Sequence, residues 1–141
     1  MSFDPINVVL EFERRINARD TKAIVDLLSL DSVFIDSLGS RVQGPNKLRG
    51  AWEGYFRMVP DYSISHDEVF RHGDTVAMFG SARGTFSEDG KIRKENFWTT
   101  NAAWRAVVKD GKITQWQVFT DNEPIRAVMR RSLPKEESTQ S

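Results

Sequence analysis

The spacing of hydrophobic residues changes once along the chain. Up to about residue 60, apolar residues recur mostly every three or four positions, which places them on one face of a helix. Beyond that point they alternate with polar residues, a pattern typical of half-buried strands. Helices followed by a run of strands indicate an α+β fold rather than repeated β–α–β units.

The first part predicts three helices and one short strand. Asp4 and Pro5 open the first helix, because Asp caps helix N-termini and Pro suits the first helical position. Asp20 caps a second, shorter helix, and Pro45 restarts a third, which ends near residue 60. A strand over residues 32–36 separates the second helix from the third.

The second part predicts four antiparallel strands, over residues 62–71, 75–85, 92–108 and 113–121. Gly-Asp and Asp-Gly pairs at the joints are hairpin signals, because Gly accepts the positive φ that such turns require. We expect a cone of curved antiparallel sheet packed on three N-terminal helices, with a pocket at its open end. A short basic helix follows near residue 124. One domain is expected over residues 1–133, and the polar residues 134–141 are expected to form a disordered tail.

Composition narrows the classes of function. Lys and Arg number 20, as do Asp and Glu, so no basic surface for nucleic acid or acidic membranes is predicted. Cys is absent and His occurs twice, which rules out disulfides and cysteine–zinc sites and argues against a multi-histidine metal site. No apolar run approaches the roughly 20 residues that span a bilayer, and no secretory pattern opens the chain. The expectation is a cytoplasmic protein without metal or cofactor.

Two aspartates, Asp36 and Asp121, end the strands that precede them. A carboxylate at the end of a strand in a cupped sheet can enter the cavity, where it can exchange a proton with a substrate. Each also has a purely structural interpretation. Asp36 can cap the turn that follows it, and Asp121 can cap the helix near residue 124. The two roles can coexist.

Strand alternation suggests further site residues. Arg83 shares a strand face with Phe79, and we expect it to enter the cone and approach a carboxylate or bound anion, although surface exposure is an alternative. Asn101 lies on one face of the long strand, while tryptophans occupy the other. By alternation Trp116 lies opposite Asp121, so an inward Asp121 predicts an outward Trp116. Two explanations compete for the tryptophan face: a cavity lined for a flat aromatic substrate, or a sheet face buried in a dimer. Unless a bulge shifts the register, the alternation favours a homodimer through the face of Trp116 and Val118.

The order of several short motifs resembles a known family. These are Asn17-Ala18-Arg19-Asp20, Ile35-Asp36-Ser37-Leu38-Gly39, Gly44-Pro45, Lys109-Asp110-Gly111-Lys112-Ile113, and 116–122. Together they resemble the SnoaL-like branch of the ketosteroid-isomerase-like superfamily, which has the nuclear transport factor 2-like fold, over roughly residues 4–131. The resemblance implies a cone of curved sheet over three helices, a dimer, and an active site inside the cone.

The resemblance also implies roles for individual residues. Asp36 falls where the isomerases hold their general base, while Phe12 stands where their oxyanion tyrosine is expected and cannot donate a hydrogen bond. Gly80-Ser81-Ala82 occupy the place of the Arg–Asp pair of limonene-epoxide hydrolases. Asp121 matches the acid/base aspartate of the polyketide cyclases.

Two hypotheses of function follow. The first is a cofactor-independent isomerase, cyclase or dehydratase that acts on a small hydrophobic, carbonyl-bearing cyclic substrate, with Asp36 and Asp121 as its acid–base groups. The alternative is a non-catalytic ligand-binding or dimerising module of the same fold. The predicted substrate-binding side chains are Phe12, Trp52, Tyr55, Phe56, Arg83, Asn101 and Phe119.

Overall fold

The computed structural model of the chain describes residues 4–132. The polar tail predicted over residues 134–141, and the predicted domain end at residue 133, lie outside this range. The elements in chain order are α1 (Pro5–Asn17), α2 (Thr21–Asp26), β1 (Leu28–Ile35), β2 (Arg41–Gln43), α3 (Pro45–Met58), β3 (Ser63–His72), β4 (Thr75–Thr85), the 3-10 helix η1 (Lys94–Asn96), β5 (Phe97–Lys109), β6 (Lys112–Thr120) and α4 (Glu123–Ser132).

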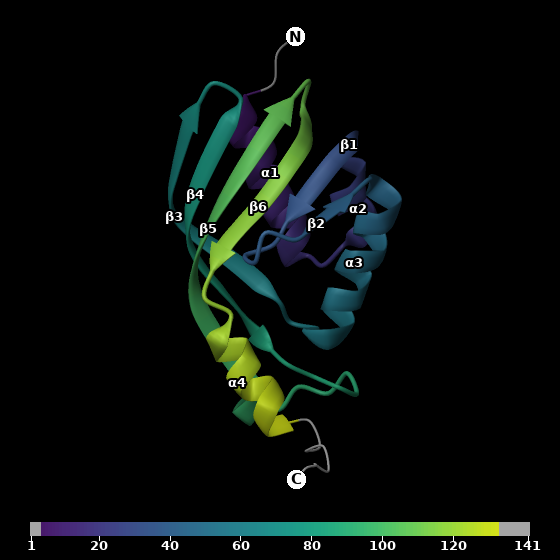
Figure 1. Ribbon diagram of the computed structural model, residues 1–141, viewed down its shortest axis with the longest axis vertical. Helices are drawn as coiled ribbons and strands as arrows, with labels where there is room; N and C mark the ends of the chain where they lie inside the picture. The colour runs from purple at the N-terminus through teal and green to yellow at the C-terminus, as the bar shows by residue number, and fades with distance from the viewer. Residues whose placement is uncertain (1–3, 133–141) are drawn as a thin grey trace.

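Six strands form one curved sheet in the order β2-β1-β6-β5-β4-β3 (Figure 1). Four of the five neighbouring pairs are antiparallel, and β1 pairs with β6 in parallel. The α+β prediction is confirmed, whereas the prediction of a wholly antiparallel sheet is wrong at this one pair. Because the two parallel strands run toward the same edge, the residues that follow Ile35 and Thr120 meet there.

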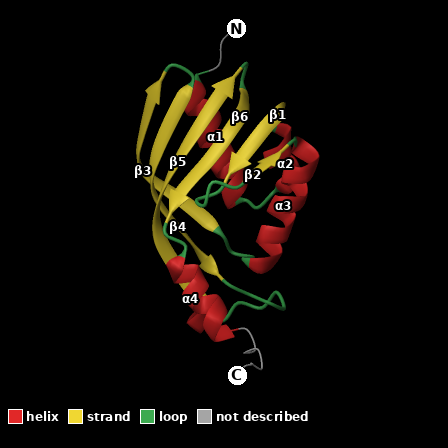
Figure 2. Cartoon of the chain, in the orientation of Figure 1, coloured by secondary structure: helices red, strands yellow, loops and turns green. Residues whose placement is uncertain are grey.

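Helices α1, α2 and α3 lie on one side of the sheet, and α4 lies at one end of it (Figure 2). The predicted caps are confirmed. The Asp4 carboxylate accepts a hydrogen bond from the Ile6 amide at 2.9 Å, with Pro5 in the first turn. The Asp20 carboxylate accepts one from the Ala23 amide at 3.1 Å. Each cap satisfies an amide that has no partner within the helix.

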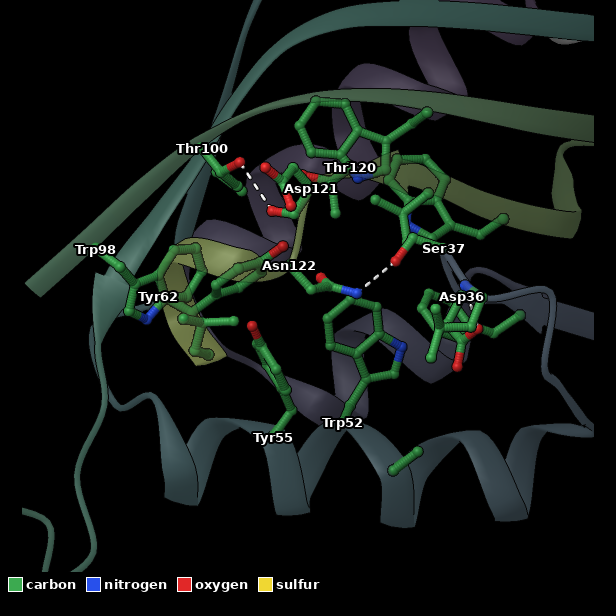
Figure 3. A pocket seen from close by; sticks show the side chains of 18 of the residues that line it. Asp36, Ser37, Trp52, Tyr55, Tyr62, Trp98, Thr100, Thr120, Asp121 and Asn122 are labelled. Carbon is green, nitrogen blue, oxygen red and sulfur yellow. Dashed lines mark hydrogen bonds between the residues drawn. The ribbon is translucent and has the colours of Figure 1, made fainter. Parts of the chain in front are cut away.

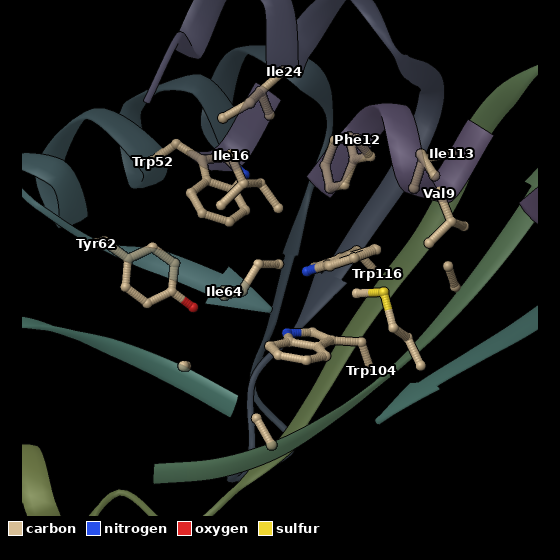
Figure 4. Packing of buried hydrophobic residues seen from close by; sticks show 14 of the residues in the cluster. Val9, Phe12, Ile16, Ile24, Trp52, Tyr62, Ile64, Trp104, Ile113 and Trp116 are labelled. Carbon is tan, nitrogen blue, oxygen red and sulfur yellow. The ribbon is translucent and has the colours of Figure 1, made fainter. Parts of the chain in front are cut away.

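The core lies between α1 and the concave face of the sheet (Figure 4). Phe12 contacts Trp116 edge to face, with ring centroids 4.8 Å apart. Trp116 in turn stacks on Trp104 at 6.4 Å. Large aromatic side chains contribute most to such a core, because each buries about 150–250 Å² of surface area away from water.

The prediction that Trp116 faces outward is therefore wrong, since its side chain is 2% exposed. The alternation of inward and outward residues holds only while the chain stays extended. Strand β6 ends at Thr120, so Asp121 belongs to the loop before α4 and its direction says nothing about Trp116. Val118, which shares the face of Trp116, also points inward and lines a cavity.

Three element boundaries differ from the sequence-based expectation. Strand β1 begins at Leu28, four residues before the strand predicted over residues 32–36, and the short strand β2 has no counterpart among the predicted elements. The run expected as a strand from residue 92 begins with the 3-10 turn η1, so that β5 starts at Phe97. Among the described residues, no helix is long and apolar enough to cross a membrane.

Candidate functional site

A cavity of about 350 Å³ lies between the concave face of the sheet, α3 and the start of α4 (Figure 3). Its wall is mainly aromatic. Helix α3 contributes side chains from below and the sheet contributes them from above, so the cavity exists because the sheet curves away from the helix. The aromatic side chains in the wall are Phe34, Trp52, Tyr55, Tyr62, Trp98, Trp104 and Trp116.

Asp36 lines this cavity directly after β1. One carboxylate oxygen, Oδ1, accepts hydrogen bonds from the amides of Leu38 and Ser40, both at 2.9 Å. The predicted turn cap is thus confirmed. The other oxygen, Oδ2, has no hydrogen-bond partner among residues 4–132. The cap holds the carboxylate in place and leaves one oxygen available to a ligand.

Asp121 lines the same cavity from the joint between β6 and α4. Its Oδ1 accepts the Glu123 amide at 2.9 Å, which is the predicted cap of α4. The Thr100 hydroxyl donates to the Asp121 backbone carbonyl at 3.0 Å and fixes the joint to β5. Asp121 is exposed, whereas Asp36 is partly buried.

The residues that follow the two aspartates are joined directly. The Asn122 amide nitrogen donates to the Ser37 hydroxyl at 2.6 Å, and both residues line the cavity (Figure 3). This bond links the turn after β1 to the start of α4. It holds the two aspartate-bearing segments at the same end of the sheet.

Tyr55 of α3 and Tyr62, just before β3, contact each other at right angles, with ring centroids 4.9 Å apart. Burial raises the pKa of the Tyr55 phenol well above its usual range. Burial, together with the neighbouring Tyr55, also raises the pKa of the Tyr62 phenol. Both side chains therefore stay neutral and able to donate a hydrogen bond over the ordinary pH range.

Three predicted site residues do not lie in the cavity wall. Arg83, Asn101 and Phe119 occupy the outer face of the sheet, because their neighbours Ala82, Ala102 and Val118 point inward. The Arg83 guanidinium donates to the Ser65 hydroxyl at 3.3 Å rather than to a carboxylate. The prediction that these side chains contact a substrate in the cone is wrong, since it took the opposite face of the sheet as the inner one.

Two further predicted residues lie behind the wall. Phe12 is fully buried in the core against Trp116. Phe56 stacks on Trp52 with ring centroids 5.5 Å apart, so it supports a wall residue without lining the cavity itself. Trp52 and Tyr55 do line the cavity, together with Asp36 and Asp121.

Sequence reasoning missed several wall residues. Trp98, Thr100 and Trp104 share one strand face, which the alternation indicated, but nothing in the pattern said that this face is concave. Tyr62 begins the strand predicted over residues 62–71, but in the structure it lies just before β3, and nothing in the pattern said that it lines a cavity. Within the described range, no group of three His, Cys, Asp or Glu side chains is arranged to hold a metal ion.

Solved structures with the same architecture are numerous. A candidate SnoaL-like polyketide cyclase from Shewanella denitrificans superposes with a TM-score of 0.78 at 14% identity, covering 91% of this chain and 98% of that one. A Catenulispora acidiphila protein with a ketosteroid isomerase-like fold gives 0.75 at 16%, covering 94% and 97%. IdmH, a candidate polyketide cyclase from Streptomyces antibioticus, gives 0.75 at 20%, covering 91% and 99%. At these identities the likeness shows the fold alone.

The sequence itself carries the family assignment. A search of curated proteins finds no match. The family model of the SnoaL-like domain, however, matches residues 9–116, from the first turns of α1 to the middle of β6. This range covers the helices α1–α3 and most of the sheet around the cavity. The chain belongs to the SnoaL-like family.

Proposed function

We propose that the cavity is the active site of a cofactor-independent acid–base enzyme, an isomerase, cyclase or dehydratase. Its substrate is a small hydrophobic, cyclic molecule that carries a carbonyl group. The observation that carries the proposal is the placement of Asp36 and Asp121, two carboxylates from distant parts of the chain, in the wall of one aromatic cavity.

The caps on the two aspartates support this role. Two backbone amides anchor Oδ1 of Asp36 and one anchors Oδ1 of Asp121, and neither Oδ2 has a hydrogen-bond partner among the described residues. An anchored carboxylate loses little freedom when a substrate binds, which favours proton transfer from a fixed position. The short bond between Ser37 and Asn122 adds to this rigidity.

The roles of the two carboxylates follow the resemblance, in which Asp36 falls at the position of the general base and Asp121 matches an acid/base aspartate. Asp36, partly buried, takes a proton from a carbon next to the substrate carbonyl. The electron pair of the broken C–H bond moves toward the carbonyl carbon, and negative charge gathers on the oxygen. Asp121, exposed at the joint with α4, returns a proton to the substrate and is protonated again from water, while Asp36 releases to water the proton that it took.

The experiment follows proton exchange at carbon, since the natural substrate is unidentified. 1-Tetralone, a small cyclic aryl ketone, is incubated with the protein in deuterated water, and loss of its α-proton signal is measured by NMR. We expect the wild-type protein to accelerate exchange over buffer. Asp36→Asn and Asp121→Asn keep the side-chain shape and remove the titrating group, so each should lower the rate by roughly 10²–10⁴-fold.

Asp67→Asn is the matched control, because Asp67 is exposed on β3 and lies outside the cavity wall. Its exchange rate should equal that of the wild type. Unchanged rates in both cavity variants would rule out the acid–base pair.

The alternative function is a ligand-binding module without catalysis. One observation favours it: Asp36 and Asp121 each complete a local backbone motif, which is reason enough for an aspartate at both positions. This alternative predicts that 1-tetralone binds while its α-protons exchange no faster than in buffer.

A further inference from the structure

The charged side chains in the cavity wall are all acidic. Asp36 and Asp121 carry two formal negative charges, and no Lys, Arg or His side chain lines the cavity. Neither carboxylate forms an ion pair within residues 4–132. The chain as a whole has no net formal charge, so the excess of negative charge belongs to this site and not to the protein at large.

Both carboxylates keep one oxygen for a ligand. Backbone amides occupy Oδ1 of each aspartate, whereas neither Oδ2 has a hydrogen-bond partner in the part of the chain that the structure describes. Asp36 is partly buried, and the wall around it is mainly aromatic. A carboxylate beside an apolar wall is partly shielded from water, so a cation there is attracted more strongly than in bulk solvent.

The aromatic part of the wall also attracts positive charge. Aromatic rings carry negative charge on their faces, and among them Trp binds cations best. Four of the aromatic side chains in the wall are tryptophans. Phe34, two residues before Asp36, contacts Trp52 with ring centroids 6.0 Å apart, so an indole lies near the Asp36 end of the wall. Groups of aromatic rings are the usual binding site of quaternary ammonium ligands.

An organic cation suits this wall better than a metal ion. Ca²⁺ and Mg²⁺ take about six or more oxygen ligands. Among the residues described, no group of three His, Cys, Asp or Glu side chains is arranged to hold a metal ion. A methylated ammonium group needs no such set of ligands, because its methyl groups pack directly against aromatic rings. Anionic ligands are repelled by both carboxylates.

We propose that the cavity binds an organic cation, a ring molecule that carries a tertiary or quaternary ammonium group. The ammonium group lies at the end of the cavity that carries Asp36 and Asp121, and the ring extends along the aromatic wall. The cavity of about 350 Å³ lies near the lower end of the roughly 300–1,000 Å³ typical of small-molecule sites, which limits the ligand to a few rings. The inference rests on the proposed function, since it adds a positive charge to that enzyme's substrate.

The test compares two probes of the same shape and different charge. Phenyltrimethylammonium carries a positive nitrogen where tert-butylbenzene carries a neutral carbon. Both dissociation constants are measured by tryptophan fluorescence at low ionic strength, because all four tryptophans line the cavity. We expect wild-type protein to bind the cation at least about tenfold more tightly. A cavity that is only apolar gives the opposite order, because moving a charge out of water is costly.

Two variants test the carboxylates. Asp36→Asn and Asp121→Asn each remove one negative charge and keep the side-chain shape. Each should weaken the binding of phenyltrimethylammonium several-fold and leave the affinity for tert-butylbenzene unchanged. Asp67→Asn is the matched control, because it removes the same charge from an exposed position on β3 outside the wall. Its affinities for both probes should equal those of the wild type.

Three results would each overturn the inference. They are equal or tighter binding of tert-butylbenzene by the wild type, a cation preference that persists unchanged in both cavity variants, and no binding of either probe.

Neither probe carries a carbonyl group, so the binding assay does not depend on catalysis. If the protein accelerates the α-proton exchange of 1-tetralone but shows no cation preference, the inference fails while the proposed function stands. If the preference is present and 1-tetralone exchanges no faster than in buffer, the proposed catalysis fails while the cation site stands.

Discussion

Gly80 marks the place where two strands approach too closely for a side chain. A Cβ at this position would lie 1.9 Å from the carbonyl oxygen of Ser65, next to the irregularity in the pairing of β3 with β4 at His66. The nearest atoms belong to the backbone of Ser65 and His66 and not to a flexible side chain, so the backbone itself would have to move. Only glycine allows this crossing.

We therefore expect Gly80→Ala to lower the free energy of unfolding by at least about 2 kcal/mol, as for other forced overlaps in a packed interior. Gly50→Ala is the matched control, because Gly50 is exposed on α3 with open space around it. There alanine should stabilise the helix by up to about 1 kcal/mol. Urea denaturation of the two variants measures the difference, and equal stabilities would contradict the strand crossing.

The two tyrosines permit a direct spectroscopic test, because Tyr55 and Tyr62 are the only ones in the chain. Burial raises the pKa of both above the ordinary value of about 10. The folded protein should thus show little phenolate absorbance at 295 nm near pH 10.5, where unfolded protein in urea shows it clearly. A normal titration of either tyrosine in the folded state would place that phenol in solvent.

The raised pKa of the two phenols makes the stability of the fold depend on pH. Above pH 10 the unfolded chain loses phenol protons that the folded chain retains, so the unfolded state gains stability relative to the folded state. The tyrosines therefore contribute fully below about pH 10, and their contribution falls as the pH rises toward the folded-state values.

At the scale of the elements, α1 protects the exposed edge of the sheet. Strand β3 is an edge strand, and its residue Ile64 has a backbone N–H and carbonyl that β4 does not pair. The Asn17 side chain at the end of α1 accepts the Ile64 amide at 2.8 Å and donates to the Ile64 carbonyl at 2.9 Å. One amide side chain thus takes the place of a neighbouring strand.

Asn17→Ala should lower the free energy of unfolding by about 1–3 kcal/mol, because it leaves both groups of a buried strand residue without their partner. Asn101→Ala, in an exposed position on the outer face of β5, is the control and should change stability by less than about 0.5 kcal/mol. Thermal or urea denaturation measures both. An Asn17→Ala variant as stable as the wild type would show that water replaces both hydrogen bonds of the Asn17 side chain at no cost.

Local signals predicted the elements well and their pairing less well. Asp4, Asp20 and Pro45 announced three helix starts, because caps depend on a few adjacent residues. The parallel pairing of β1 with β6 joins segments some 80 residues apart and leaves no trace in local periodicity. Strand β2, of three residues, is too short to show any alternation.

At the scale of the whole molecule, the sequence placed both aspartates at strand ends but could not say which sheet face is concave. That property depends on how the sheet curves around α1 and α3. Taking the wrong face moved Arg83, Asn101 and Phe119 into the predicted site and moved Trp116 out of it. Asp36 and Asp121 line the cavity regardless, because both follow the last residue of a strand rather than sit within one.

The homodimer stays a prediction, and the structure changes the surface expected to form it. Trp116 is buried, but Phe79, Ala103 and Phe119 are direct cross-strand neighbours on the outer face of β4, β5 and β6. Phe79 and Phe119 are 44% and 50% exposed. Phe70 extends the row, because its ring packs against that of Phe79 with the ring centroids 6.1 Å apart. An exposed apolar row across three strands is typical of an interaction surface.

A second copy of the chain is the occupant that we expect on this surface, since a two-fold axis lets each row cover the other. The zero formal net charge offers no repulsion between copies.

Phe119→Asp would place a carboxylate in the middle of the interface and should convert a dimer into a monomer at micromolar concentration, as measured by sedimentation. Leu30→Asp, on β1 away from the row and 92% exposed, should leave the dimer intact. All four tryptophans line the cavity on the opposite face, so their fluorescence should stay unchanged on dissociation. A wild-type protein that sediments as a monomer would exclude this interface.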